Sequence, residues 1–316
     1  MKCLVAVIGP TAVGKSQFAL RLAQDFDGEI VNSDSRQVYR YMDIGTAKPS
    51  HTELSLVRHH LIDIINPDEP FSLAIYQKLA HDAIENIQQR HKLPLLVGGS
   101  GLYIWSVIEG WKIPPVAPDA KLRHSLEIRA KEEGGSTLYQ ELQKIDPVAA
   151  NKIMPTNLRR IIRALEICRV TGQPISQLWQ KQTPPYPVLI IGLTMRRDNL
   201  YRTIDCRVDE MIKQGLIEEV KDLMAKGYSL DLPSMSGIGY KQIGNFLQGK
   251  LDLTTAIQQM KNETHRFARH QYAWFHLNDA RIHWLNEYDD IQKEATSLVT
   301  TFLSGLSYKQ VNYEIH

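Results

Sequence analysis

Short apolar runs and helical patterns alternate along the first third of the chain. The apolar runs are typical of buried parallel strands and predict strands at Leu4–Ile8, residues 29–32 and Leu93–Val97. Helices are predicted at residues 16–24, 72–89 and 101–109. The second helix carries apolar residues every three or four positions, at Leu73, Tyr76, Leu79, Ala83 and Ile87. Strands that alternate with helices indicate a parallel α/β sheet.

The pattern changes after residue 112. Residues 113–119 hold three prolines and predict a linker. The polar, helical residues 120–182 contain no predicted strand, and a second proline cluster at residues 184–187 closes them. Residues 188–193 predict a further strand, and the chain is mostly helical from Asp198 onward. The simplest interpretation is a helical insertion that returns the chain to the same sheet.

Composition and charge are those of a globular protein. The 316 residues are 43% hydrophobic and 23% charged, and the net charge of +2 means that a nucleic-acid partner would need local basic patches. The three cysteines are far apart and indicate neither a zinc site nor a disulfide framework. Because the sequence shows no secretory signal and no apolar run of membrane-spanning length, we expect a soluble cytoplasmic protein.

Residues 9–16 (GPTAVGKS) match the phosphate-binding pattern G-x-x-x-x-G-K-[ST], between a predicted strand and a predicted helix. Glycines let backbone amides turn toward phosphate oxygens, Lys15 adds a cation, and the Ser16 hydroxyl suits Mg²⁺ as a metal ligand. The predicted diphosphate- or nucleotide-binding residues are Gly9, Pro10, Thr11, Ala12, Val13, Gly14, Lys15 and Ser16. ATP, another nucleotide or a prenyl diphosphate would each fit this loop.

The loop predicts the fold class more closely: an α/β, P-loop NTPase-like parallel-sheet core with a mainly helical insertion domain and a helical C-terminus. We place the P-loop catalytic core at residues 1–117 and 188–316. The insertion domain takes residues 118–187.

Polar residues follow the second predicted strand and the strand at residues 93–97. Asp34 is expected at the same sheet edge as the phosphate loop. A carboxylate there either holds Mg²⁺ through water or acts as a general base. The alternative is that Asp34 or Ser35 caps a helix. In residues 43–49, Gly45 permits an unusual turn and Lys48 offers a cation, unless this is an ordinary surface loop. Residues 98–101 (GGSG) predict a phosphate or backbone contact, or only a tight turn.

Two basic segments are candidates for binding nucleic acid. An apolar stripe at Leu158, Ile161, Leu165 and Cys168 leaves Arg159, Arg160 and Arg163 on other faces of a predicted helix, for phosphates or for solvent. Further on, cations interleave with aromatic residues: Lys261, Arg266, Phe267, Arg269, Tyr272, Trp274 and Phe275. That mixture suits RNA, but a packed helix with solvated cations explains it equally well.

The phosphate loop and several further segments together carry a more specific signal than the loop alone. They are GPTAVGKS (9–16), DSRQVYR (34–40), MDIGTAKP (42–49), LVGGSGLY (96–103), DP (146–147) with RRIIRALE (159–166), GIGYKQ (237–242) and residues 264–275. In this order and spacing they resemble the tRNA dimethylallyltransferase family, the isopentenylpyrophosphate:tRNA transferases. The resemblance runs along nearly the whole chain.

The resemblance implies a chemistry for the site. The phosphate loop would hold the diphosphate of dimethylallyl diphosphate with Mg²⁺ instead of hydrolysing ATP, and Thr11 would contact the leaving group. Asp34 would take a proton from the exocyclic amine of the adenosine 3′ of the tRNA anticodon. Arg207 would be a further catalytic residue, in contact with the diphosphate. The insertion domain would contact tRNA. The tRNA-binding residues that the resemblance implies are Asp34, Ser35, Arg36, Gln37, Ser100, Arg123, Arg159, Arg160 and Arg163.

The sequence departs from the family pattern in several positions. Asn157 stands where an aspartate is usual, so its role as a cap is open. Thr203 occupies the first of two arginine positions four apart, which leaves Arg207 as the second. His265 and His270 replace basic residues and weaken that surface at neutral pH.

Other functions share the phosphate loop. A free-nucleotide prenyltransferase needs no grip on tRNA, a small-molecule kinase would use Asp34 to deprotonate a hydroxyl, and an RNA-binding NTPase would need no transfer chemistry. The segments after the loop favour tRNA prenylation over all three. We expect a monomer that binds the tRNA anticodon stem-loop and has no membrane partner.

Overall fold

The structure is a computed structural model that describes residues 2–114, 116, 119–182, 184–286 and 290–313. The chain forms two compact units, Met1–Ile108 with Pro185–His316, and Glu109–Pro184. The sequence places the same division at 117/118 and 187/188, so the second unit begins nine residues earlier in the structure (109 against 118). Residues 117 and 118 themselves lie outside the described part of the chain.

The first unit is built on a six-stranded parallel sheet of order β3-β2-β4-β1-β5-β6. The strands are β1 (Leu4–Ile8), β2 (Gly28–Asn32), β3 (His59–His60), β4 (Leu93–Gly98), β5 (Val188–Thr194) and β6 (Ile282–Asn286). The four strands that the apolar runs predict are confirmed within one residue at each end, and β3 and β6 are additions. β1 lies between β4 and β5, with Val7 opposite both Val97 and Ile191.

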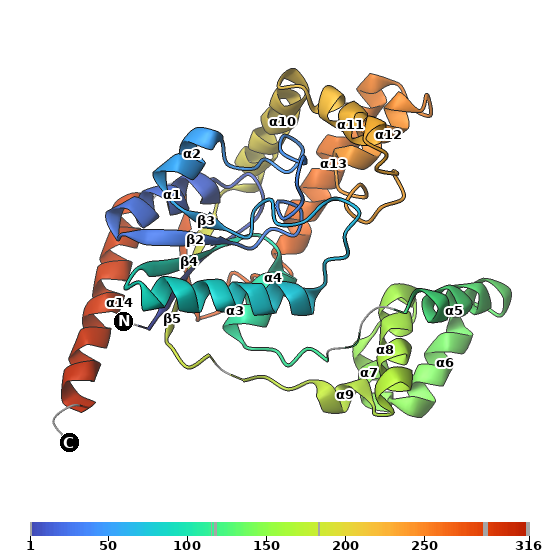
Figure 1. Ribbon diagram of the computed structural model, residues 1–316, viewed down its shortest axis with the longest axis horizontal. Coiled ribbons are helices and arrows are strands. Elements are labelled where there is room, and N and C mark those ends of the chain that lie inside the picture. Colours follow the sequence, from blue (N-terminus) through green and yellow to red (C-terminus); the bar gives the residue numbers. More distant parts are fainter. Residues whose placement is uncertain (1, 115, 117–118, 183, 287–289, 314–316) are drawn as a thin grey trace. The chain divides into compact units, whose positions relative to one another are not determined.

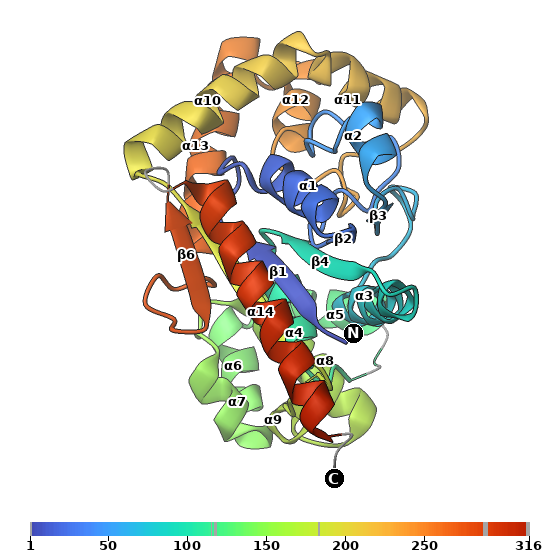
Figure 2. The same ribbon diagram turned by 90° about the vertical axis from the view of Figure 1, so that its left-hand side faces the viewer.

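Helices cover both faces of this sheet (Figures 1 and 2). On one face α1 (Lys15–Asp25) and α14 (Ile291–Tyr313) share a core with alternate strand residues such as Val5 and Val7. The intervening strand residues face α3 (Leu73–Gln89) and α4 (Gly101–Ile108), which pack on each other and, through α3, on β2 and β4. The chain direction therefore brings the ends of β1, β2 and β4 to one edge.

The predicted apolar stripe of α3 is only partly correct. Its buried apolar residues are Tyr76, Ala80, Ile84 and Ile87. The predicted members Leu73, Leu79 and Ala83 are only half-buried. They lie on either side of the row of residues, spaced by three or four, that faces the sheet. The buried face of α3 is therefore rotated from the one that the sequence pattern indicates.

A second core lies beyond the carboxyl edge of the sheet. It joins the loop after β2 to helices α10–α13, through side chains such as Val38, Met42, Leu216 and Tyr240. The helices around it are α10 (Arg197–Lys213), α11 (Leu216–Ala225), α12 (Tyr240–Leu247) and α13 (Leu253–Gln271), whereas α2 (His51–Leu56) packs on α1. This core gives the loop after β2 a fixed support.

The second unit is helical, as predicted. Its helices are α5 (Ala120–Glu132), α6 (Gly135–Ile145), α7 (Pro147–Lys152), α8 (Leu158–Thr171) and α9 (Ile175–Leu178). The stripe on α8 is confirmed because Ile161, Leu165 and Cys168 are buried in the unit's core. Asn157 caps α8: its side-chain oxygen accepts a 3.2 Å hydrogen bond from the Arg160 amide. The cap that the sequence leaves open is therefore present.

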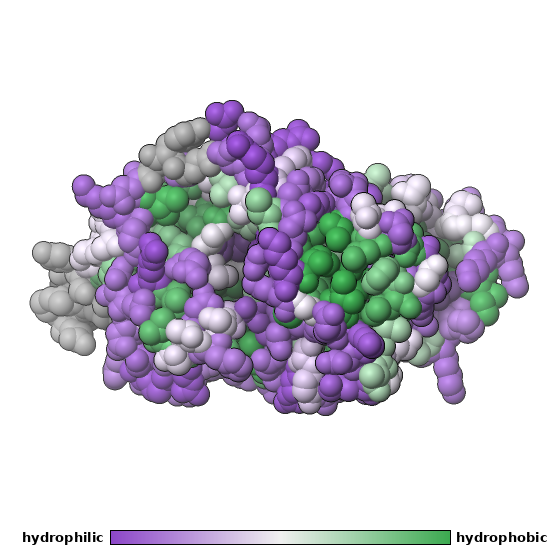
Figure 3. All heavy atoms as spheres, turned by 90° about the horizontal axis from the view of Figure 1, so that it is seen from above, coloured by the Kyte–Doolittle hydropathy of each residue, from purple (hydrophilic) through white to green (hydrophobic). Residues whose placement is uncertain are grey.

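The face seen in Figure 3 is largely hydrophilic, with hydrophobic residues gathered in separate areas. Within the described residues, the helices are all too short or too polar to span a lipid bilayer.

Candidate functional site

The phosphate loop leaves the carboxyl end of β1 and runs into α1, as its sequence context predicts. Gly9, Ala12 and Gly14 have φ values of 145°, 64° and 96°, so the backbone reverses repeatedly within the loop. A Cβ on Gly9 would lie 2.4 Å from the Leu193 carbonyl oxygen, so only glycine fits there. Helix α1 begins at Lys15 with no side-chain cap, so its first amides are open to an anion.

Three charged side chains meet beside this loop: Lys15, Arg207 and Asp34. Desolvation lowers the pKa of Lys15 to about 7, with Arg207 lowering it further and Asp34 opposing both. Burial also lowers the pKa of Arg207, against the attraction of Asp34. Lys15 Nζ donates to the Pro10 carbonyl at 2.6 Å, and Arg207 makes no hydrogen bond or ion pair with the described residues. Two basic groups that make no ion pair with the one carboxylate beside them suit a polyanionic ligand, which would also restore the charge of Lys15.

Asp34 is held by the backbone on both sides of it. Its amide donates to the Asn32 side-chain oxygen at 3.1 Å, and its own Oδ1 accepts from the Arg36 amide at 2.8 Å. These bonds close a turn, and no helix starts here, so the prediction of a helix cap at Asp34 or Ser35 is wrong. The second oxygen, Oδ2, has no donor among the described residues. Asp34 is therefore oriented through one oxygen while the other stays available.

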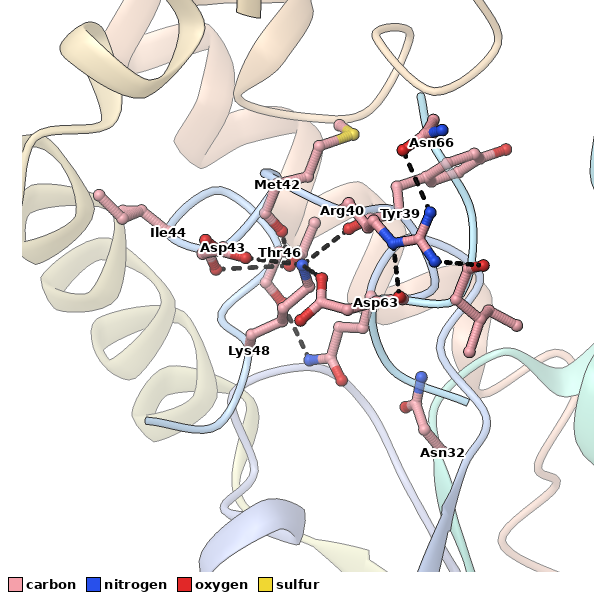
Figure 4. Close-up of polar contacts among 12 residues, drawn as sticks. Asn32, Tyr39, Arg40, Met42, Asp43, Ile44, Thr46, Lys48, Asp63 and Asn66 are labelled. Carbon is pink, nitrogen blue, oxygen red and sulfur yellow. Dashed lines mark hydrogen bonds and ion pairs between the residues drawn. The ribbon is translucent and has the colours of Figure 1, made fainter. Parts of the chain in front are cut away.

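The cation of Lys48 is used inside the loop and not offered to a ligand (Figure 4). Its side chain is 4% exposed, and Nζ donates to the Tyr39 carbonyl at 2.7 Å and contacts Asp43 Oδ1 at 2.6 Å. It also pairs with Asp63. Lys48 thus ties residues 39 and 43 of the loop after β2 to Asp63, which follows β3, and the prediction of a ligand-facing cation gives way to an internal role.

Glu219 on α11 anchors the same loop from the other side. Its carboxylate accepts hydrogen bonds from the amides of Asp43, Ile44 and Gly45 at 2.9, 2.7 and 3.1 Å. The hydroxyl of Tyr240 donates to it at 2.6 Å. Gly45 is not in the left-handed region; a Cβ there would lie 2.6 Å from the Tyr240 ring. The glycine therefore serves close packing, which corrects the predicted unusual turn.

The predicted tRNA contacts in this unit lie close to Asp34 but are partly engaged already. The Arg36 guanidinium donates to the Ser234 carbonyl at 3.1 Å. The side-chain nitrogen of Gln37 donates to the backbone carbonyls of residues 46 and 47, both at 3.1 Å. The Ser35 amide lies 3.4 Å from the Ser100 hydroxyl, so the structure brings these two predicted residues together.

The glycines at residues 98–101 permit close approach of neighbouring segments. A Cβ on Gly98 would lie 2.4 Å from the Ser33 carbonyl oxygen, and one on Gly101 would lie 2.3 Å from the Trp274 ring. A Cβ on Gly99 would lie 2.2 Å from the side-chain nitrogen of Gln271. For residues 98–101, these distances favour a contact with the backbone and side chains of other protein segments over a tight turn alone.

Gln271, at the end of α13, is the residue that sequence reasoning missed. It is 3% exposed, and its side-chain oxygen accepts from the Thr11 amide at 2.7 Å. Its side-chain nitrogen donates to the Gly99 carbonyl at 2.8 Å. Nothing in its local sequence singles it out, because its partner Thr11 lies 260 positions away.

The aromatic residues of the C-terminal segment divide between packing and surface. Phe275 is fully buried, and the Tyr272 hydroxyl lies 2.9 Å from that of Thr194. The Trp274 carbonyl accepts from the Trp105 ring nitrogen at 2.9 Å. Phe267 remains 42% exposed. The packed-helix interpretation therefore holds for the last three aromatics, whereas Phe267 is exposed.

The four arginines predicted in the second unit fall into two classes. Arg123 and Arg163 pair with the fully buried Glu166 at 2.8 and 2.5 Å. Arg159 and Arg160 are exposed, and their guanidinium groups form no ion pair within the described residues. Among the described residues, the acidic partner of Arg123 and Arg163 is therefore present, and none is found for Arg159 and Arg160.

The parallel sheet, the open start of α1 and the charges beside it define a P-loop α/β protein. The family described as IPP transferase has a model that matches residues 37–278, most of the chain, beginning just after the phosphate loop and Asp34. The chain belongs to this IPP transferase family.

Relatives of known name cover the chain almost completely. It is 50% identical over 302 residues to a tRNA dimethylallyltransferase of Roseiflexus sp., covering 96% of this chain and 99% of that relative. It is 48% identical to the tRNA dimethylallyltransferase of Dehalococcoides mccartyi, covering 95% and 93%. The solved tRNA isopentenylpyrophosphate transferase of Bacillus halodurans is 42% identical with a TM-score of 0.72, over all of both chains. A eukaryotic dimethylallyltransferase solved acting on tRNA is 28% identical with a TM-score of 0.84, covering 96% and 80%.

Proposed function

We propose that this enzyme transfers the dimethylallyl group of dimethylallyl diphosphate to the exocyclic amine of the adenosine 3′ of a tRNA anticodon and releases diphosphate. Membership of the tRNA dimethylallyltransferase family gives the reaction class. The observation that carries the assignment within the site is the juxtaposition of an anion-binding loop, two cations and one oriented carboxylate.

The phosphate loop holds the leaving group in this proposal. An allylic carbon loses diphosphate readily once the charge on the leaving oxygens is neutralised. Lys15 moves from the Pro10 carbonyl to the diphosphate, and Arg207 and Thr11 contact it from the side. Ser16 is exposed at the start of α1, where its hydroxyl fits as one ligand of Mg²⁺. Bound there, the cation would add charge neutralisation on the diphosphate oxygens.

Asp34 acts on the acceptor. The amine of adenine is a poor nucleophile, so a base that removes its proton as the new carbon–nitrogen bond forms assists the reaction. Oδ1 of Asp34 is fixed by the Arg36 amide, which leaves Oδ2 for the amine. The adenine must leave its stack in the anticodon loop to reach this oxygen.

The tRNA contacts come from both units. Arg159 and Arg160 are exposed and form no ion pair with the residues that the structure describes, so we assign their guanidinium groups to backbone phosphates. Arg123 and Arg163, bound to Glu166, would offer only their remaining donors. Near Asp34, we assign contacts with the target nucleotide to Ser35, Arg36, Gln37 and Ser100, of which Ser35 and Ser100 lie beside each other. We further propose that the enzyme works as a cytoplasmic monomer on the anticodon stem-loop.

Product analysis tests the assignment of the acceptor atom. After reaction, the tRNA is digested to nucleosides, and mass spectrometry locates the added prenyl group. We expect it on the exocyclic nitrogen of the adenosine 3′ of the anticodon, and no product from a tRNA that carries guanosine there. A prenyl group at another base, or an undiminished yield from the guanosine variant, would reject the proposal.

A further inference from the structure

The side-chain amide of Gln271 joins the two loops on which the proposed reaction depends. Its oxygen accepts from the Thr11 amide in the phosphate loop, and its nitrogen donates to the Gly99 carbonyl after β4. Both partners are backbone groups, and the side chain is 3% exposed. A buried side-chain amide that accepts a hydrogen bond from one loop and donates one to another fixes the distance between the two loops.

From Gly99 the connection continues to the loop of Asp34. The Ser100 amide lies 3.4 Å from the Ser33 carbonyl oxygen, and the Ser100 hydroxyl lies 3.4 Å from the Ser35 amide. Gly98 packs against the Ser33 carbonyl so closely that no side chain fits between them. The segment after β4 therefore lies directly between the phosphate loop and the loop that carries Asp34.

The end of α13 is a firm base for this amide. Helix α13 runs for 19 residues, and its first turn is capped by Asp252, which accepts from the Thr255 amide at 2.9 Å. Just after the helix, Trp274 packs against Gly101, and Phe275 is fully buried. Gln271 is thus held at its backbone by packing that does not depend on a bound ligand.

We propose that Gln271 is a positioning residue for transfer: its amide sets the spacing between the diphosphate held by the phosphate loop and the base Asp34. The role rests on the proposed function. Reacting atoms must meet within a fraction of an ångström for efficient transfer, so a loosened Thr11 should cost rate more than stability. The amide does not touch the reacting atoms and acts only through Thr11 and Gly99.

The first test compares Gln271→Met with Gln88→Met. Methionine fills the space of glutamine but forms neither hydrogen bond. Gln88 is a matched control, since it is also buried and donates at 2.9 Å to a backbone carbonyl, that of Cys3. Cys3 directly precedes β1, at the end of the strand away from the phosphate loop. We expect Q271M to lower kcat and affinity for inorganic diphosphate roughly tenfold to a hundredfold, and Q88M to change both less than twofold. The tRNA dissociation constant should stay within twofold of wild type in both.

The second test uses Gln271→Glu, which keeps the shape and the acceptor for Thr11. When ionised, the carboxylate faces the Gly99 carbonyl and loses the donor; when protonated, it restores both hydrogen bonds. The transfer rate of Q271E divided by the wild-type rate at each pH should therefore rise as the pH falls from 9 to 6. The charged groups that face the same loop, Lys15, Asp34 and Arg207, are present in both proteins, so the pH dependence that the two proteins share cancels in this ratio.

The proposal would be overturned if Q271M kept wild-type kcat and diphosphate affinity and only its melting temperature fell, as in Q88M. It would also be overturned if the rate of Q271E relative to wild type did not change with pH. If Q271M does not fold, Q271E decides alone. If wild-type enzyme transfers nothing to tRNA, the proposed function fails, whereas diphosphate calorimetry on Q271M still decides whether the amide positions the phosphate loop.

Discussion

The two units each place arginine or lysine cations around a carboxylate, but with opposite outcomes. In the second unit, Glu166 is fully buried and accepts from Arg123, Arg163 and the Asp119 amide. In the first unit, Asp34 faces Lys15 and Arg207, and neither cation forms an ion pair with it. The Glu166 cluster of the second unit is closed by ion pairs and hydrogen bonds, whereas Lys15 and Arg207 form no ion pair with Asp34 in the first unit.

The pKa shifts record the same difference. Burial alone would raise the pKa of Glu166, but the hydrogen bonds from Arg123 and Arg163 outweigh it, so the net pKa is lowered. Lys15 shows the reverse situation: burial and Arg207 lower its pKa to about 7. Removing one partner from a paired cluster leaves a buried charge uncompensated, whereas unpaired groups with shifted pKa values beside a phosphate loop indicate a ligand site.

The largest effect is expected from Asp34→Asn. Asparagine keeps the oxygen that accepts from the Arg36 amide, so the turn should survive while the base is lost. Transfer in a single turnover should fall roughly a hundredfold to ten-thousandfold, with the tRNA dissociation constant unchanged. A tRNA affinity that falls in parallel with the rate would show that Asp34 organises the loop and is not the base.

Lys15→Met should come next. Diphosphate binding to wild type requires the lysine cation, so at pH 8, above its pKa of about 7, binding should draw nearly one proton from the buffer. Calorimetry in two buffers of different protonation enthalpy measures that uptake. We expect K15M to bind diphosphate roughly a hundredfold more weakly and to lack the lysine's share of the uptake. Equal proton uptake in both proteins would contradict a neutral lysine in the free site.

Glu166→Gln probes the complete cluster. It should lower the free energy of unfolding by about 2 kcal/mol, discounted because both arginines are about one-third exposed. The folded-state pKa of Glu166 is below its usual 4.5, so the stabilisation is present above pH 4.5 and is lost as the pH falls further. Glu141→Gln, at a less buried carboxylate with two arginines, is the control and should cost less. A larger loss for E141Q would reverse our ranking of the two clusters.

The smallest effect is expected from the exposed arginines. Replacing Arg159 and Arg160 together by alanine should raise the tRNA dissociation constant about tenfold and lower its salt dependence by one or two charges. The activity at saturating tRNA should not change. Removing two exposed cations of the first unit, Lys213 and Lys221, is the matched control for net charge. Equal losses in the two double variants would mean that only overall charge matters.

The elements near the site could be predicted from the sequence because each depends on local patterns. The apolar runs of β1 and β4 and the glycines and lysine of residues 9–16 are contiguous signals, and the structure reproduces them. Strand β6 could not be predicted in this way, because only two of its five residues, Ile282 and Leu285, are buried. At the edge of the sheet, its apolar pattern is too short to distinguish from that of a helix or loop.

The candidate site shows the same limit. The proximity of Asp34 to the phosphate loop follows from parallel topology, which the sequence predicts. The internal use of Lys48 and the bridge made by Gln271 depend on partners distant in sequence, such as Asp63 and Thr11, and no local pattern encodes them. Tertiary packing decides which polar side chains are structural and which remain for the ligand.

The most direct measurement is transfer of label from dimethylallyl diphosphate to unmodified tRNA with Mg²⁺ and without ATP, with free AMP as the parallel acceptor. The account predicts label on tRNA, none on AMP, and labelling of tRNA by the D34N variant that is slower by roughly a hundredfold or more. Label on AMP alone would place the enzyme among free-nucleotide prenyltransferases, and no label on either acceptor would contradict prenyl transfer altogether.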